Sequence, residues 1–133
     1  AWVKDIEMVC IPKREPIDFF GIKTTGCPEF VALVERWPKL KGKPTGRYTQ
    51  RLLPEGIAFD LFMVTPETWG FQLAIRTGSA DFSHRILAKG WVALGYHSEG
   101  GVLMRNGTPT FMREERDLFT LLGIPWIEPE ART

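Results

Sequence analysis

The chain opens with an alternation of apolar and polar positions that predicts a β-strand. Residues 2–11 alternate, and three apolar residues would face one side of the sheet: Ile6, Met8 and Cys10. Asp5 and Glu7 face the other side. Pro12 ends this run, and the polar residues 13–26 are predicted to form a loop.

A different spacing follows and predicts a helix. Apolar side chains recur at intervals of three and four residues, as on the buried face of an amphipathic helix: Phe30, Leu33, Val34 and Trp37. Pro28 suits the first turn of this helix, and Pro38 ends it.

Three more strands are predicted, over residues 47–53, 57–64 and 71–75. Pro54-Glu55-Gly56 is a turn signal between the first two. The strand over residues 57–64 is almost entirely apolar, but Asp60 lies in its middle.

The last third of the chain predicts a second lobe of mixed structure. A helix is expected from Phe82 to Gly95, followed by short strands at residues 96–99, 102–105 and 108–111. Asn106-Gly107 is the strongest hairpin signal in the chain. A final helix is predicted over residues 113–122, with Gly123 as its C-terminal stop.

Composition excludes several classes of protein. The 133 residues include 17 Lys and Arg and 16 Asp and Glu, so the net charge is +1 and no bulk basic field attracts nucleic acid. Cys10 and Cys27 are not spaced for zinc or for a disulfide framework, which favours a cytoplasmic location. No apolar run reaches the roughly 20 residues of a membrane span, so no membrane partner is expected. Because Ala1 directly precedes a predicted strand, we expect an upstream segment.

Three carboxylates are the candidate chemical site. Asp5 and Glu7 lie two residues apart on one strand, so both face the same side of the sheet. Asp60 would join them if its strand is a neighbour. Such a group would suit two Mg²⁺ ions about 3.5–4 Å apart, with Mn²⁺ as a substitute. From spacing alone, a solvated strand face is the simpler interpretation.

Four segments in order resemble the nucleotidyltransferase superfamily and, within it, the family X DNA polymerases. They are Asp5-Ile6-Glu7-Met8, Phe59-Asp60-Leu61, Ile75-Arg76-Thr77-Gly78-Ser79-Ala80-Asp81-Phe82 and Phe119-Thr120-Leu121-Leu122-Gly123-Ile124-Pro125-Trp126-Ile127-Glu128-Pro129, followed by Arg132. Each motif is weak to moderate by itself, whereas the ordered set covers most of the chain.

The resemblance implies an α+β fold and a role for each matched residue. The palm, a mixed sheet flanked by helices, would span residues 1–76, and a small α+β thumb would span residues 77–133. Asp5 and Glu7 would bind both metal ions, and Asp60 would bind the ion at the hydroxyl and accept its proton. A second group would contact the nucleotide: Arg76, Thr77, Gly78, Ser79 and Ser83. An ordinary exposed helical serine is an equally good interpretation of Ser83.

The chain departs from the family pattern at several positions. The aromatic pair before Thr77 is Ile75-Arg76 here, which leaves the choice between deoxyribose and ribose open. The Arg that usually precedes the third acid is Ala58, and we expect Arg47 or Arg51 to replace its charge. Leu87 occupies a position where polymerases of this family often carry a basic residue that contacts the template strand. The segment that cradles the triphosphate would precede Ala1.

Basic residues gather between positions 39 and 51: Lys39, Lys41, Lys43, Arg47 and Arg51. They could follow a nucleic-acid backbone, and Lys43, Arg47 and Arg51 are the candidate contacts. A solvated basic edge strand explains the same charges equally well.

The sequence thus predicts metal-dependent transfer of a nucleotide from a nucleoside triphosphate to a DNA 3′-hydroxyl, in a setting such as repair. One alternative is a nucleotidyltransferase that acts on RNA or protein. Another is a non-catalytic nucleic-acid-binding module of the same fold.

Overall fold

The computed structural model of the chain describes residues 3–133, so Trp2, at the start of the first predicted strand, lies outside the described residues. The chain forms two compact units that divide after Val64. The predicted boundary between palm and thumb lies later, after Arg76, and it remains a proposal.

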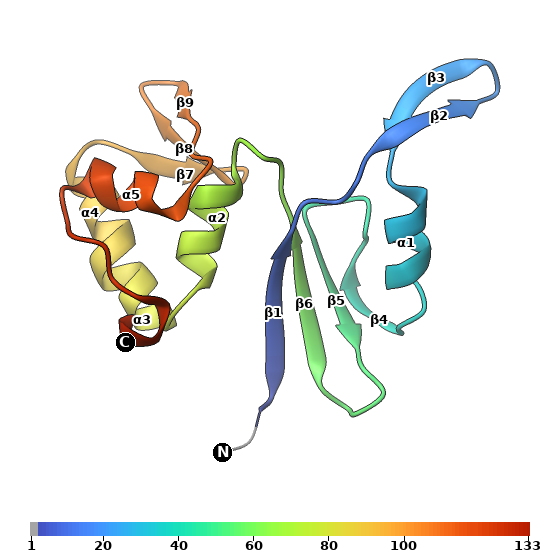
Figure 1. Cartoon of the computed structure of the whole chain (residues 1–133), viewed down its shortest axis with the longest axis horizontal. Coiled ribbons are helices and arrows are strands. Elements are labelled where there is room, and N and C mark those ends of the chain that lie inside the picture. Colours follow the sequence, from blue (N-terminus) through green and yellow to red (C-terminus); the bar gives the residue numbers. More distant parts are fainter. Residues whose placement is uncertain (1–2) are drawn as a thin grey trace. The chain divides into compact units, whose positions relative to one another are not determined.

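The first unit is built on a mixed four-stranded sheet (Figure 1). Its strands, in spatial order, are β1 (Asp5–Cys10), β6 (Ala58–Met63), β5 (Tyr48–Leu52) and β4 (Lys39–Gly42). β1 and β6 run parallel, whereas the pairs β6–β5 and β5–β4 are antiparallel. Strands were predicted at β1, β5 and β6, and the structure confirms all three. β4, within the basic segment, was missed.

Helix α1 (Pro28–Val34) packs on one face of this sheet through Phe30 and Val34, as predicted, whereas Leu33, also expected on the buried face, is 45% exposed. Val34 is buried against Leu61 and Met63 of β6. The residues that alternate with Leu61 and Met63 on β6 lie on the other face of the sheet, away from α1.

The loop predicted over residues 13–26 is wrong. These residues form an antiparallel hairpin of β2 (Glu15–Phe19) and β3 (Ile22–Gly26). The turn has φ of 51° at Phe20 and 77° at Gly21. Positive φ at both central positions is the geometry of a tight type I′ hairpin. A phenylalanine is a rare residue for the first of these positions, which is why the sequence carried no turn signal.

The second unit begins with helices. α2 (Trp69–Arg76) is followed by a continuous helical run of α3 (Ala80–Phe82), a π-helical segment η1 (Ser83–Ala88) and α4 (Lys89–Ala93). The run confirms the helix predicted between Phe82 and Gly95. The strand predicted at residues 71–75 is wrong, because this segment is α2. Short apolar runs do not distinguish a strand from a buried helix, and here packing against α5 decides for the helix.

A small sheet and a last helix complete the second unit. The sheet has strands β7 (His97–Glu99), β8 (Val102–Arg105) and β9 (Thr108–Thr110), as predicted. Asn106 and Gly107 form the expected hairpin turn, with φ of 52° and 74°. Helix α5 (Glu115–Leu122) ends at Gly123, whose φ is 68°, and the short 3₁₀ helix η2 (Pro129–Ala131) lies near the C-terminus.

One hydrophobic core holds these elements of the second unit together. Side chains that are almost completely buried come from α2, the helical run, β8 and α5: Phe71, Ala74, Phe82, Leu87, Leu103, Leu118 and Phe119. The fold is therefore α+β in both units, as predicted.

Candidate carboxylate site and thumb turn

The parallel pairing of β1 with β6 brings the predicted acids to one face of the sheet. Glu7 is the register partner of Asp60, and Asp5 is the partner of Ala58, two residues before it. Register partners and residues two apart on a strand point to the same side. The neighbouring strands that the candidate site requires are therefore present.

The acids differ in their surroundings. Asp5 and Glu7 are exposed, whereas Asp60 is only 6% exposed. Oδ1 of Asp60 accepts a short hydrogen bond from the hydroxyl of Tyr48 and another from Nε2 of Gln50 at 3.0 Å. A buried carboxylate is tolerated when such donors stabilise it. Asp60 is thus held from the β5 side.

The contacts of Tyr48 and Gln50 with Asp60 were not predicted from the sequence, although a signal was present. They alternate on β5 with the buried Thr49 and Arg51, so they lie on the opposite face of the strand. Gln50 is the register partner of Asp60. The available signal was that two polar residues share one face of a strand, and that the next strand carries an acid among apolar residues.

The residue types and strand positions fit a divalent cation, since carboxylate oxygens are the ligands that Mg²⁺ prefers. Within residues 3–133, however, no three acidic, histidine or cysteine side chains are gathered closely enough to hold a metal ion. The strands place Asp5, Glu7 and Asp60 on one face of the sheet, and their role as metal ligands remains a proposal.

The structure corrects the expectation for Arg51. This residue is 5% exposed, and its guanidinium donates to Thr49 Oγ1 at 3.1 Å and to the Trp37 carbonyl at 3.3 Å. Arg51 therefore faces away from Asp60 and does not replace the missing arginine at Ala58. Its burial also argues against the predicted contact with nucleic acid.

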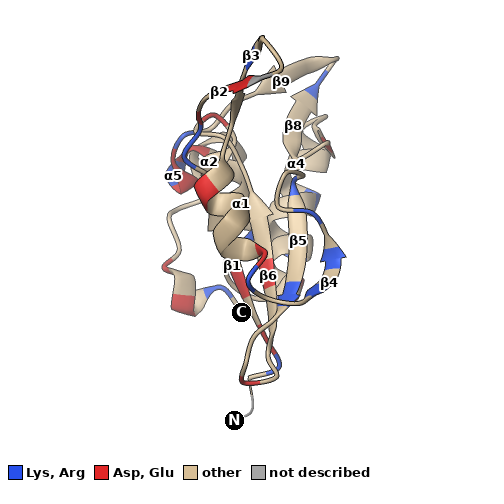
Figure 2. Ribbon diagram, turned by 90° about the vertical axis from the view of Figure 1, so that its right-hand side faces the viewer, with Lys and Arg blue, Asp and Glu red and all other residues tan. Residues whose placement is uncertain are grey.

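The other predicted basic contacts are exposed. Lys43 and Arg47 lie in the connection between β4 and β5, and Figure 2 shows blue basic positions along β4 and β5. Lys41 of β4 is the register partner of Gln50. One row of the sheet therefore leads from a lysine through Gln50 and Asp60 to Glu7.

In the second unit, the predicted turn at Thr77, Gly78 and Ser79 is present and internally bonded. Thr77 Oγ1 donates to the Leu73 carbonyl at 2.6 Å, and Ser79 Oγ accepts from the Phe82 amide at 3.0 Å. Ser79 is thus the N-cap of the helical run.

The neighbouring candidates have different surroundings. Ser83 is half-buried, and its hydroxyl donates to the Ile75 carbonyl at 2.8 Å, so it is not the ordinary exposed serine of the simpler interpretation. Arg76 is exposed at the end of α2.

The C-terminal segment packs directly on this turn. Arg132 is 1% exposed, and its Nη1 donates to Glu115 Oε2 at 2.7 Å while Nε donates to the Ile127 carbonyl at 3.0 Å. Its guanidinium carbon lies 5.0 Å from the ring centroid of Phe119 and 4.8 Å from that of Trp126. These contacts fix the backbone of Arg132, whose carbonyl accepts from the Ser79 amide at 2.9 Å.

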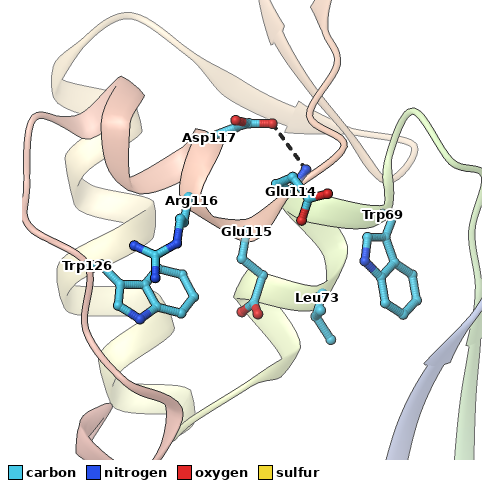
Figure 3. A pocket seen from close by; sticks show the side chains of 7 residues that line it. All are labelled: Trp69, Leu73, Glu114, Glu115, Arg116, Asp117 and Trp126. Atoms are coloured by element: carbon cyan, nitrogen blue, oxygen red, sulfur yellow. Dashed lines mark hydrogen bonds between the residues drawn. The ribbon is translucent and has the colours of Figure 1, made fainter.

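A pocket of about 400 Å³ opens beside α5 in the same unit (Figure 3). It is lined by Trp69, Leu73, Glu114, Glu115, Arg116, Asp117 and Trp126. Its acids already have structural roles. Glu114 and Asp117 form the capping box of α5, and Glu115 pairs with Arg132. The pocket's polar side chains therefore stabilise α5 and the C-terminal segment.

Comparisons with known proteins agree with this architecture. Residues 72–133 match the family model described as DNA polymerase beta thumb. Two crystal structures of Leishmania infantum polymerase beta are similar in fold. The ternary P/T complex has a TM-score of 0.58 and 19% identity, and the match covers 80% of this chain and 51% of that chain. The ternary gap complex has a TM-score of 0.58 and 18% identity, with 79% and 47% covered.

The chain spans about half the length of these solved relatives, and at such identities the likeness establishes the fold. No curated protein matches the chain. In the described part of the chain, no helix is long and apolar enough to cross a lipid bilayer.

Proposed function

We propose that the chain is a family X DNA polymerase-like protein, because residues 72–133 match the polymerase beta thumb and the fold is similar to that of polymerase beta. On this premise it transfers a nucleotide from a nucleoside triphosphate to a DNA 3′-hydroxyl. The observation that carries the proposal is the register of Glu7 with Asp60 on parallel neighbouring strands. It places acids of β1 and β6 on the sheet face that α1 leaves uncovered.

Asp5, Glu7 and Asp60 would hold the divalent cations. Two Mg²⁺ ions held there would activate the 3′-hydroxyl and would stabilise the charge on the departing pyrophosphate. The chain's own part is to orient the carboxylates and to accept the hydroxyl proton. Asp60 is the best acceptor, because burial and its two donors keep its carboxylate in one orientation.

The remaining candidate residues would bind the substrates. In the second unit, the turn at residues 77–79 and the hydroxyl of Ser83 would contact the nucleotide, and the exposed Arg76 would meet phosphate. In the first unit, Lys43 and Arg47 would contact the DNA backbone, since both are exposed in a basic connection.

Primer extension with the full-length protein tests the proposal. The substrates are a labelled primer on gapped DNA, deoxynucleoside or ribonucleoside triphosphates, and Mg²⁺. Glu7→Gln and Asp60→Asn should each lower the rate by at least about 100-fold, because each removes a carboxylate ligand. Glu55→Gln makes the same chemical change in an exposed turn of the first unit and should leave the rate unchanged.

Each alternative has its own outcome in this experiment. Preferential incorporation of ribonucleotides onto an RNA primer would favour the RNA-directed enzyme. DNA binding without any transfer in the presence of Mg²⁺ or Mn²⁺ would favour the non-catalytic module. If Asp60→Asn and Glu7→Gln matched Glu55→Gln in rate, the carboxylate mechanism would be wrong.

A further inference from the structure

The two hydrogen bonds to Asp60 share one feature, because both reach the same carboxylate oxygen. Tyr48 Oη and Gln50 Nε2 both donate to Oδ1. The two oxygens of a carboxylate diverge from the carboxyl carbon, so donors on Oδ1 fix the direction of Oδ2 as well. The orientation of the whole Asp60 side chain is therefore determined from β5.

Both donors are themselves held in place. Gln50 lies opposite Asp60 in the β5–β6 register, and Tyr48 lies opposite Phe62. The Tyr48 ring packs on the Phe62 ring with 4.9 Å between centroids. The phenol is thus presented to Asp60 by a cross-strand aromatic contact, which is a common stabilising pair in sheets.

Both donors are also neutral. In the described part of the chain, Asp60 takes part in no ion pair, and Arg51 on the same strand donates to Thr49 and Trp37 on the opposite face. Neutral donors orient a carboxylate without cancelling its charge, whereas a paired cation would cancel much of it. The Asp60 side chain is therefore oriented without an ion-pair partner, on the face that it shares with Glu7.

We propose that Tyr48 and Gln50 are positioning residues, which hold Oδ1 of Asp60 so that Oδ2 is available to a divalent cation on the β1 side. This inference rests on the proposed function and adds to it the residues that prepare the third carboxylate. Partners that orient a ligand in this way typically change metal affinity by about 10–100-fold when they are removed.

The effect can be measured without turnover as Mn²⁺ binding to the nucleotide-free full-length protein. Electron paramagnetic resonance monitors this binding through the loss of the signal of free Mn²⁺. Tyr48→Phe removes one donor and keeps the ring that packs on Phe62. Gln50→Met removes the other. We expect each to weaken Mn²⁺ binding by roughly 10-fold. Gln50→Lys, which places a cation beside Asp60, should weaken it more than Gln50→Met.

Tyr96→Phe is the matched control, because it makes the same chemical change in the second unit. It should bind Mn²⁺ as the unchanged protein does. In primer extension, the site variants should raise the Mg²⁺ concentration for half-maximal rate, while the nucleotide KM at saturating Mg²⁺ stays constant. A purely structural role would not separate these two quantities.

The outcomes distinguish this inference from the proposed function. If Asp60→Asn loses Mn²⁺ binding while Tyr48→Phe and Gln50→Met remain within about twofold of Tyr96→Phe, the positioning role is wrong and the proposed function stands. If Asp60→Asn keeps both Mn²⁺ binding and transfer, the proposed function itself fails. Thermal unfolding checks each variant, and Gln50→Met alone decides if Tyr48→Phe does not fold.

Discussion

Gly78 and Arg132 lie in direct contact, since a Cβ atom on Gly78 would be 2.5 Å from Cβ of Arg132 and 2.9 Å from its carbonyl oxygen. The same carbonyl accepts the hydrogen bond from the Ser79 amide. The turn at residues 77–79 therefore packs against the C-terminal segment. Any nucleotide contact that the turn makes depends on that packing.

Gly78→Ala should destabilise the second unit by more than about 1 kcal/mol. The φ of Gly78 is 94°, which is strained for alanine, and the new methyl group would also collide with Arg132. Chemical denaturation measures the change. Gly107→Ala is the control, because its φ is 74° but no atom lies within 4 Å of the added Cβ. Equal losses for the two variants would show that the contact with Arg132 contributes nothing.

Local sequence patterns predicted most of the helices and strands. The alternation in β1, the spacing in α1 and the Asn106-Gly107 signal each determine structure within a few residues, so the sequence was sufficient there. Prediction from local patterns failed where contacts with other segments of the chain determine the structure. α2 is helical because its apolar face packs on α5, and β2 and β3 form a hairpin around a Phe-Gly turn that carries no usual signal.

The candidate site shows the same division. Asp5, Glu7 and Asp60 could be selected from sequence, because two acids alternate on a strand and the third interrupts an apolar run. The alternation on β5 places Tyr48 and Gln50 on one face, but the sequence could not show that they meet Asp60, because a strand does not reveal its register with another strand. Register decided that Gln50 faces Asp60 while Arg51 faces the core.

Glu115→Ala should destabilise the second unit by roughly 3–5 kcal/mol, because it leaves the charge of the buried Arg132 without its partner. The Arg132 side chain is 0% exposed and that of Glu115 is 16% exposed, so water cannot replace the lost contact fully. Equilibrium unfolding in urea measures the loss.

Asp81→Ala provides the comparison for that ion pair. It breaks the pair of Asp81 with Arg85, whose side chains are 63% and 55% exposed, and it should cost less than about 1 kcal/mol. A loss for Glu115→Ala as small as the loss for Asp81→Ala would mean that the aromatic contacts of Arg132 and its hydrogen bond to the Ile127 carbonyl hold it without Glu115.

Leu87 has a packing role, which accounts for an apolar residue at a position where a basic template contact is common. Its side chain is fully buried in the core of the second unit. Leu87→Ala should therefore lower the free energy of unfolding by roughly 2–5 kcal/mol. Ile86→Ala, at the adjacent 38% exposed position, should have a much smaller effect. Comparable losses for both would contradict the burial of Leu87.

Cys10 should make the first unit lose stability at alkaline pH. Burial raises the pKa of its thiol above the ordinary value of 9.0, and the nearby Cys27 raises it further. The folded state therefore favours the neutral thiol. This contribution to stability is complete below the pKa of the unfolded chain and is lost as pH rises through the pKa of the folded protein. Denaturation curves on either side of this window should show a smaller decline for Cys10→Ala than for the unchanged protein. An identical decline would mean that the Cys10 thiol titrates alike in the folded and unfolded chain.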